Sequence, residues 1–351
     1  MIFYQHTDRI TPDRGFRARA DRPLALLRHC PVYEPTRLCC QPDLATAVGV
    51  RKLWVKDESQ RMGLGSFKAL GGAFAVVQMI SDAAGGAGIR TPAARATAAA
   101  MTFVTASAGN HGLSLAAGAH LFGASACIVL SASVPESFAD RIRRAGGDVY
   151  RAGDTYEESV ASAEYLARTN GWLLLADGSW PGYTERPALV MEGYTVIAEE
   201  CRQSFEQENA WPSQVVLQAG VGGMAAALAG HIRDAWAVQP NITVVEPDRA
   251  ACLQESARAG KLTRATGALS NMGRLDCKDA SLLAYESLRG DADTFVSISD
   301  HEATIAADRL REVGHPTTPS GAAGFAALAH LDLSDQDRCL IILSEGPEDL
   351  P

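Results

Sequence analysis

Short apolar runs alternate with amphipathic stretches over most of this chain. Runs of consecutive, mainly apolar residues indicate buried parallel strands. They lie at 126–130, 172–175, 214–217, 242–245 and 339–343. Helical spacing of apolar positions indicates helices. These lie at 135–145, 156–168 and 187–202. Strands that alternate with helices predict an α/β fold with twisted, mostly parallel sheets flanked by helices.

Composition and charge exclude several classes of protein. Apolar residues make up 47% of the 351 residues, which is enough for a sizeable core. The net charge of -9 argues against a nucleic-acid surface. Because no apolar run approaches the roughly 20 residues that span a bilayer, we expect no membrane partner. The N-terminus lacks the pattern of a signal peptide, which predicts a cytoplasmic protein.

Two features bear on the organisation of the chain. The stretch 84–100 is rich in Ala, Gly, Thr and Pro without a period, which indicates a surface loop or linker. The eight cysteines follow neither a zinc-binding nor a disulfide-scaffold pattern, so no metal site is expected. Cys252 and Cys277 flank a segment that we expect to be irregular. The sequence allows a disulfide or two buried free thiols there, and we prefer the thiols.

The segment 55–68 predicts a strand, a glycine-containing loop and a helix that begins at Lys68. A lysine amine is a useful imine former when it is desolvated. Phe67 before Lys68 and the apolar Ala69 after it favour such a partly buried amine. An ordinary surface lysine at a helix start is the alternative.

Two more segments, 105–112 and 218–224, also lead from a strand-like run into a helix. Free backbone N–H groups and the helix dipole bind anions at such junctions. We therefore expect 107–111 to hold a substrate carboxylate and 218–224 to form an anion cup, with a purely structural turn as the alternative for the second. His111 precedes a glycine at a helix start, which is more typical of an orienting or structural side chain than of an acid–base group.

Together the three segments resemble pyridoxal-phosphate (PLP) enzymes of the tryptophan-synthase-β class, known as fold type II. The resemblance implies that Lys68 carries PLP through its amine, beside Phe67. It implies that Asn110 bonds the phenolic oxygen of the cofactor and that Ser344 meets the pyridine nitrogen, unless Ser344 is simply a strand-end residue. The phosphate is assigned to Gly220, Val221, Gly222, Gly223 and Met224.

The resemblance also implies a domain organisation and a partner. A small α/β domain at about 91–175 is inserted into a large PLP-binding domain formed by 1–90 and 176–351. The substrate-binding residues of the chain are then Ser107, Ala108, Gly109, His111 and Asp177. A homodimer is expected.

The stretches 56–68, 176–194 and 245–247 resemble diaminopropionate ammonia-lyases more than threonine dehydratases. In that family an Asp at the position of Asp177 lies near the β-substituent of the substrate. Its carboxylate pairs with a cationic β-amino group and assists proton traffic as the group leaves. A surface turn at Asp177-Gly178 is the alternative.

One departure from the lyases concerns the substrate isomer. They carry an acidic residue just before Gly-Asn-His, where this chain has Ala108, which cannot exchange a proton. Pro347 is a second departure. The resemblance predicts PLP-dependent α,β-elimination on a β-substituted L-amino acid similar to 2,3-diaminopropionate, giving a 2-oxo acid and ammonia. An L-serine or L-threonine dehydratase, a β-replacement synthase and a non-catalytic ligand-binding regulator are the alternatives.

Overall fold

The computed structural model describes residues 3–5, 12–30 and 32–347. Contacts divide the chain into two compact units. The larger comprises Met1–Phe67, Gly178–Thr184 and Tyr194–Pro351, and the smaller comprises Lys68–Asp177 and Glu185–Gly193. The predicted domain boundary at 91–175 stays a prediction.

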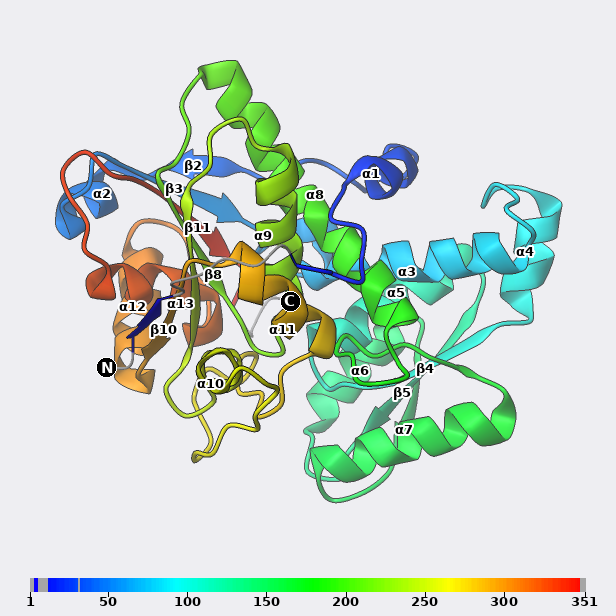
Figure 1. Cartoon of the computed structure of the whole chain (residues 1–351). Coiled ribbons are helices and arrows are strands. Elements are labelled where there is room, and N and C mark those ends of the chain that lie inside the picture. Colours follow the sequence, from blue (N-terminus) through cyan, green and yellow to red (C-terminus); the bar gives the residue numbers. More distant parts are fainter. Residues whose placement is uncertain (1–2, 6–11, 31, 348–351) are drawn as a thin grey trace. The chain divides into compact units, whose positions relative to one another are not determined.

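The larger unit is built on a seven-stranded sheet, counted over the described residues, in the order β1-β10-β9-β8-β11-β3-β2 (Figure 1). In chain order its strands are β1 (Phe3–Gln5), β2 (Leu38–Cys40), β3 (Lys52–Asp57), β8 (Gln214–Gln218), β9 (Asn241–Pro247), β10 (Thr294–Ile298) and β11 (Arg338–Leu343). The five inner strands run parallel, and β1 and β2 pair antiparallel at the edges.

The larger unit also contains helices. They are α1 (Asp21–Leu27), α2 (Pro42–Val48), α9 (Gly223–Ala235), α10 (Cys252–Ala259), α11 (Leu282–Asp291), α12 (Asp300–Glu312) and α13 (Pro319–Ala326), with the 3₁₀ turns η1 (Arg61–Gly63) and η2 (Ala327–His330). Val216 and Ile341 of the inner strands share one buried apolar cluster with Leu310 of α12. Burial of the inner strands explains why their sequences read as continuous apolar runs.

The smaller unit contains a parallel four-stranded sheet in the order β6-β5-β4-β7, within the described part of the chain. Its strands are β4 (Thr102–Ala106), β5 (Ser125–Leu130), β6 (Asp148–Arg151) and β7 (Leu173–Leu174). Its helices are α3 (Lys68–Ala83), α4 (Pro92–Ala99), α5 (Asn110–Phe122), α6 (Glu136–Arg144) and α7 (Tyr156–Asn170). Helix α8 (Glu185–Glu208) begins in this unit and continues in the larger one.

The predicted α/β class with mostly parallel sheets is confirmed, and the predicted strands and helices coincide with observed ones. The loop predicted at 84–100 is wrong for 92–99, which form α4. Thr91 caps this helix by accepting a hydrogen bond from the Ala94 N–H at 3.2 Å, and Pro92 occupies its first turn. Alanine has the highest helix propensity, so a capped alanine-rich segment forms a helix without strong periodicity.

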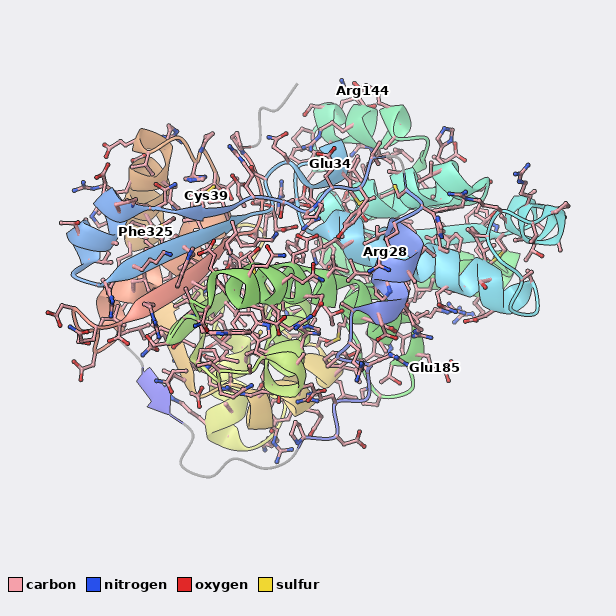
Figure 2. The ribbon with its side chains drawn as sticks, turned by 90° about the horizontal axis from the view of Figure 1, so that it is seen from above. Arg28, Glu34, Cys39, Arg144, Glu185 and Phe325 are labelled. Carbon is pink, nitrogen blue, oxygen red and sulfur yellow. The ribbon has the colours of Figure 1, made fainter. Side chains whose placement is uncertain are left out.

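All eight cysteines lie in the described residues, and each is a free thiol. This answers the open alternative for Cys252 and Cys277 in favour of thiols. Cys39, on edge strand β2, is one of the partly exposed thiols (Figure 2). In the described ranges, no helix combines the length and apolar character needed to cross a bilayer.

Candidate active site

Helix α3 begins at Lys68, whose amine pairs with a carboxylate. Lys68 Nζ donates a hydrogen bond to Asp177 Oδ2 across 2.5 Å. The two side chains are 20% and 26% exposed. Ser114 Oγ of α5 donates to the Lys68 carbonyl at 2.7 Å. Glycine at position 72 permits this approach, because a Cβ there would lie 2.2 Å from Ser114 Oγ.

Asp177 is a carboxylate under ordinary conditions. Burial alone would raise its pKa, but the positive charge of Lys68 outweighs burial. The hydrogen bond from Lys68 acts in the same direction, and the pKa of Asp177 is held well below its usual range.

Among the described residues, one ring nitrogen of His111 has a hydrogen-bond partner and the other has none. Its Nε2 lies 2.8 Å from the carbonyl oxygen of Leu175. Because a carbonyl only accepts, Nε2 carries the proton and Nδ1 is the acceptor nitrogen of the neutral ring. Burial lowers the pKa of His111, which favours that neutral ring. Nδ1 is buried and has no hydrogen-bond partner among the described residues.

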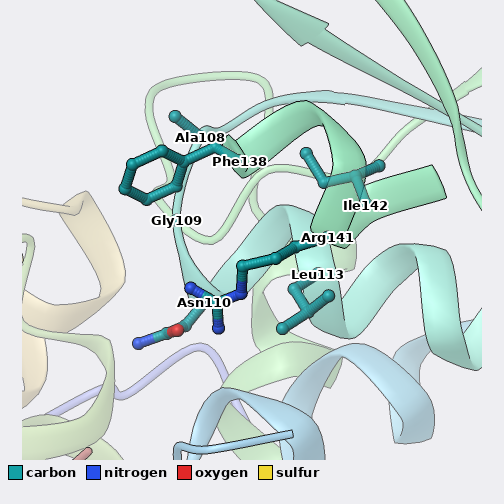
Figure 3. Close-up of a pocket in the computed structure, with 7 residues that line it drawn as sticks. All are labelled: Ala108, Gly109, Asn110, Leu113, Phe138, Arg141 and Ile142. Carbon is teal, nitrogen blue, oxygen red and sulfur yellow. The ribbon is translucent and has the colours of Figure 1, made fainter. Parts of the chain in front are cut away.

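The loop before α5 leaves the helix N-terminus without a side-chain cap among the described residues. Gly109 is the N-cap, and its N–H donates to Ser107 Oγ at 3.3 Å. Ala108, Gly109 and Asn110 line a small pocket (Figure 3). The predicted residues Ser107 to His111 therefore form one loop and the start of α5. Lys68 and Asp177 belong to the same, smaller unit.

The glycine turn between β8 and α9 lies in the larger unit. Gly222 is the N-cap of α9 with φ of 98°, and within the described chain no side chain caps that helix start. A Cβ on Gly222 would lie 2.8 Å from Leu253 Cδ1 and 2.9 Å from Ala284 Cβ. Only glycine fits this position, and the positive end of the α9 dipole lies at this turn.

Ser344 lies at the carboxyl end of β11, beside the glycine turn at the end of β8. Strands β8 and β11 are parallel neighbours, so their carboxyl ends share one edge of the sheet. Gln218 Nε2 reaches across to the carbonyl oxygen of Ile342 at 2.8 Å. The carbonyl of buried Ser344 accepts from the Phe67 N–H at 3.1 Å. The glycine turn, Ser344 and Phe67 thus gather at one edge, and Lys68 follows Phe67 directly in the chain.

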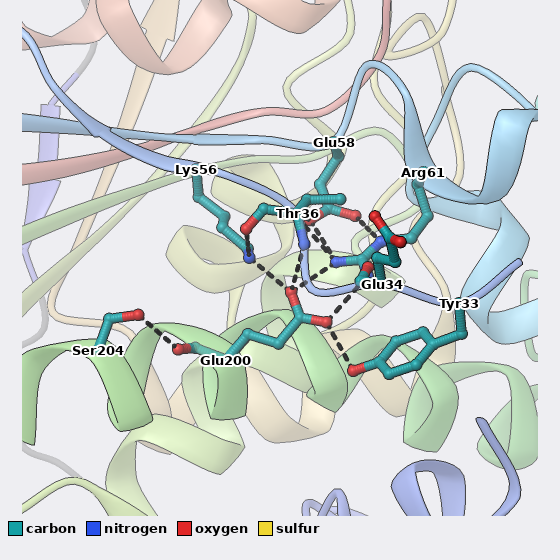
Figure 4. Close-up of polar contacts among 8 residues, drawn as sticks. All are labelled: Tyr33, Glu34, Thr36, Lys56, Glu58, Arg61, Glu200 and Ser204. Atoms are coloured by element: carbon teal, nitrogen blue, oxygen red, sulfur yellow. Dashed lines mark hydrogen bonds and ion pairs between the residues drawn. The ribbon is translucent and has the colours of Figure 1, made fainter. Parts of the chain in front are cut away.

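A buried ionic cluster in the larger unit supports the loop before Phe67 (Figure 4). The Arg61 side chain is fully buried and pairs with Glu58 at 2.7 Å and Glu200 at 2.8 Å. The Glu200 carboxylate also accepts hydrogen bonds from Lys56 Nζ at 2.5 Å and from the Tyr33 hydroxyl at 2.9 Å. Lys56, Glu58 and Arg61 belong to the stretch that carries the family resemblance, whereas Tyr33 and Glu200 were not singled out from the sequence. Charged residues that alternate with apolar ones at the end of the buried strand β3 are the pattern in the sequence that could have indicated this ionic cluster.

Comparison with known proteins identifies the family. The model described as "Pyridoxal-phosphate dependent enzyme" matches residues 30–345. The chain is 33% identical over 323 residues to the diaminopropionate ammonia-lyase of Escherichia coli strain K12, covering 88% of this chain and 80% of the relative.

Solved structures agree with this match. The holo diaminopropionate ammonia lyase from Escherichia coli, with selenomethionine incorporated, has a TM-score of 0.87 at 29% identity, covering 99% of this chain and 94% of that one. The same enzyme in complex with an aminoacrylate-PLP azomethine reaction intermediate has a TM-score of 0.86 at 29% identity and the same coverage.

The chain therefore belongs to the pyridoxal-phosphate dependent enzymes, and its cofactor is pyridoxal 5'-phosphate. It has the fold type II architecture and is a carbon–nitrogen lyase of the ammonia-lyase kind. Each unit has a feature that fits part of the cofactor. In the larger unit the start of α9, which only glycine can form, has no side-chain cap among the described residues, which suits a phosphate. The smaller unit has a partly buried lysine amine.

Proposed function

We propose that the substrate is L-2,3-diaminopropionate, converted with water to pyruvate and two ammonia. The observation that carries the proposal is the Asp177 carboxylate beside the Lys68 amine. A fixed negative charge next to the reacting amine suits a substrate with a cationic β-amino group, since charge-assisted hydrogen bonds are the stronger kind. The names of the relatives reported above support the same substrate class.

Lys68 would hold the cofactor covalently, and Asn110 would donate to its phenolic oxygen. The 220–224 turn would bind the phosphate through backbone N–H groups at the start of α9. Ser344 would meet the ring nitrogen with a neutral hydroxyl. When bound, the cofactor supplies a sink for the electron pair left on Cα.

The side chains of the smaller unit then divide the proton transfers. The Lys68 amine takes the Cα proton once substrate has displaced it, because a base must lie within hydrogen-bond reach of that proton. Asp177 pairs with the β-ammonium group and holds it in line for departure. Ser107, Gly109 and His111 belong to the loop that holds the substrate carboxylate, with His111 in an orienting role.

Ala108 limits the reaction to the L-isomer. A D-isomer presents its Cα proton to the opposite face, where a methyl group cannot accept it. The absence of a carboxylate at this position is thus a specificity feature of the chain.

Two other activities of the same chemistry must be distinguished from the proposed one. An L-serine or L-threonine dehydratase would release a 2-oxo acid with one ammonia, and a β-replacement synthase would consume an added nucleophile. The test is 2-oxo acid release from L-2,3-diaminopropionate, L-serine and L-threonine by the holoprotein, with and without added thiol. Preference for L-serine, or a thioether product in place of pyruvate, contradicts the proposal.

We further propose a cytoplasmic homodimer with a small domain at about 91–175. Eight free thiols and the lack of any disulfide in the described chain are typical of a reducing compartment. Light scattering after size-exclusion chromatography tests the dimer, because a monomeric mass would contradict it.

A further inference from the structure

One buried hydroxyl group joins the first turns of α3 and α5 in the smaller unit. Ser114 Oγ of α5 donates to the carbonyl oxygen of Lys68, the first residue of α3, at 2.7 Å. Ser114 is buried and lies 46 positions from Lys68 in the chain. Leaving a buried donor unsatisfied is unfavourable, so this bond resists displacement of the Lys68 main chain.

The backbones of α3 and α5 also approach each other closely at two glycines. Gly72 lies one turn after Lys68, and a Cβ there would lie 2.2 Å from Ser114 Oγ. Gly118 lies one turn after Ser114, and a Cβ there would lie 3.1 Å from Ala73 Cα. Closely packed interiors tolerate little displacement. The start of α3 is therefore held against α5 by packing as well as by the hydroxyl group.

The same turn of α5 also holds the chain that leads to Asp177. His111 lies three positions before Ser114, so the two side chains share one face of the helix. His111 Nε2 donates to the carbonyl oxygen of Leu175 at 2.8 Å, and Leu175 precedes Asp177 by two residues. One helical turn thus fixes the main chain near both members of the Lys68–Asp177 pair.

We propose that Ser114 is a positioning residue for the Lys68 amine. The inference rests on the proposed function, in which Lys68 first anchors the cofactor and then, once displaced, acts as the base at Cα. In the second role the long side chain is no longer held at its far end. Its reach then depends on where the main chain of Lys68 lies, and small displacements of a reacting group lower rates strongly.

Ser159 of α7 supplies a matched control in the same unit. It is buried, and its Oγ donates to the carbonyl oxygen of Ala152 at 2.9 Å. Ser159→Ala therefore removes the same kind of hydrogen bond at a place that holds none of the proposed site residues. Ser159→Ala and Ser114→Ala should unfold at similarly lowered urea concentrations.

The test follows, by NMR, the exchange of the Cα proton of L-alanine with deuterium from heavy water in the presence of the holoprotein. L-Alanine has no β-leaving group, so the exchange reports removal and return of the proton by the base without elimination. The dissociation constant of L-alanine is measured in parallel by calorimetry. The unmodified chain is compared with Ser114→Ala, Ser114→Cys and Ser159→Ala.

Ser114→Ala should slow the exchange about tenfold, the rate factor of one hydrogen bond, and leave the affinity for L-alanine within about twofold. The affinity is retained because Ser114 acts through Lys68. Ser114→Cys should exchange at an intermediate rate, since a thiol is a weaker donor than a hydroxyl. Ser159→Ala should match the unmodified chain.

An equal loss of exchange in Ser114→Ala and Ser159→Ala, or weaker L-alanine binding that accounts for the slower exchange, overturns the proposal. If Ser114→Ala does not fold, undiminished exchange by Ser114→Cys overturns it. Failure to release pyruvate from L-2,3-diaminopropionate would contradict the proposed function and leave the exchange comparison intact. Undiminished exchange in Ser114→Ala would contradict the positioning role alone, and lack of exchange by the unmodified chain would contradict both.

Discussion

The Lys68 amine and the Asp177 carboxylate are joined by a 2.5 Å hydrogen bond from Nζ to Oδ2. The two residues lie 109 positions apart, one at the start of α3 and the other after β7. The pair keeps a negative charge beside the amine that we propose as the covalent anchor and base. It links the proposed cofactor lysine to the residue that we expect to bind the leaving group.

Asp177→Asn should lower kcat on L-2,3-diaminopropionate by about a hundredfold, because a neutral amide neither pairs with the β-ammonium group nor assists its proton. Binding of L-alanine, which has no β-amino group, should change little. Asp148→Asn, an exposed carboxylate of the same unit, serves as control. An equal loss of L-alanine affinity would mean that Asp177 acts elsewhere.

The same variant has a predictable pH dependence of stability. The pKa of Asp177 is lowered in the folded protein, so its stabilising contribution is present above the unfolded value of about 4 and is lost as pH falls toward the folded value. The stability gap between the apo forms of the unmodified chain and Asp177→Asn should be constant from pH 6 to 8 and shrink below about pH 4. Urea unfolding across this range measures it, and a gap that widens in acid contradicts the assignment.

Gly222→Ala should destabilise the protein by about 1–2 kcal/mol and weaken PLP binding. A residue with a Cβ is destabilised by about this amount at positive φ, and Leu253 and Ala284 leave no room for the methyl group. Gly260→Ala is the matched control, since Gly260 also has positive φ but meets nothing within 4 Å. Both variants should lose stability, and only Gly222→Ala should lose cofactor affinity in a fluorescence titration. Unchanged affinity would argue against the turn as phosphate site.

Glu200→Gln should destabilise the fold by about 3–5 kcal/mol, because it leaves Lys56 and Arg61 with too little compensating charge in the interior. Tyr33→Phe removes a single hydrogen bond to the same carboxylate and should cost about 1 kcal/mol. Chemical denaturation of both variants gives the comparison. A similar loss of unfolding free energy in the two variants would show that charge pairing does not stabilise the cluster.

Ala108→Asp should create turnover of D-2,3-diaminopropionate, since it supplies a base on the face that the methyl group now occupies. Pyruvate release from matched D- and L-isomers measures this, with Ala108→Asn as the isosteric control without a base. Comparable turnover of both isomers by the unmodified chain would sink the idea.

Sequence reasoning reached the class of fold because buried parallel strands are read directly from apolar runs, as at 339–343 in β11. It predicted the glycine-containing turn at 218–224 but not the close contacts with Leu253 and Ala284 that exclude a Cβ at Gly222. It missed β6, because that edge strand alternates exposed and partly buried residues.

Ion pairs between residues far apart in the chain could not be predicted from the sequence. Arg61 and Glu200 are 139 positions apart, and no local pattern specifies that one neutralises the other.

The most direct test of the central claim is the ratio of products from L-2,3-diaminopropionate. Purified holoprotein is incubated with the substrate, and pyruvate and ammonia are quantified in the same sample, with Lys68→Ala as the inactive variant and Lys261→Ala as an exposed-lysine control. The account predicts two ammonia per pyruvate from the unmodified chain and Lys261→Ala, and neither product from Lys68→Ala, which should also lack a borohydride-reducible bond to PLP. Equal amounts of ammonia and pyruvate, or full activity in Lys68→Ala, would contradict it.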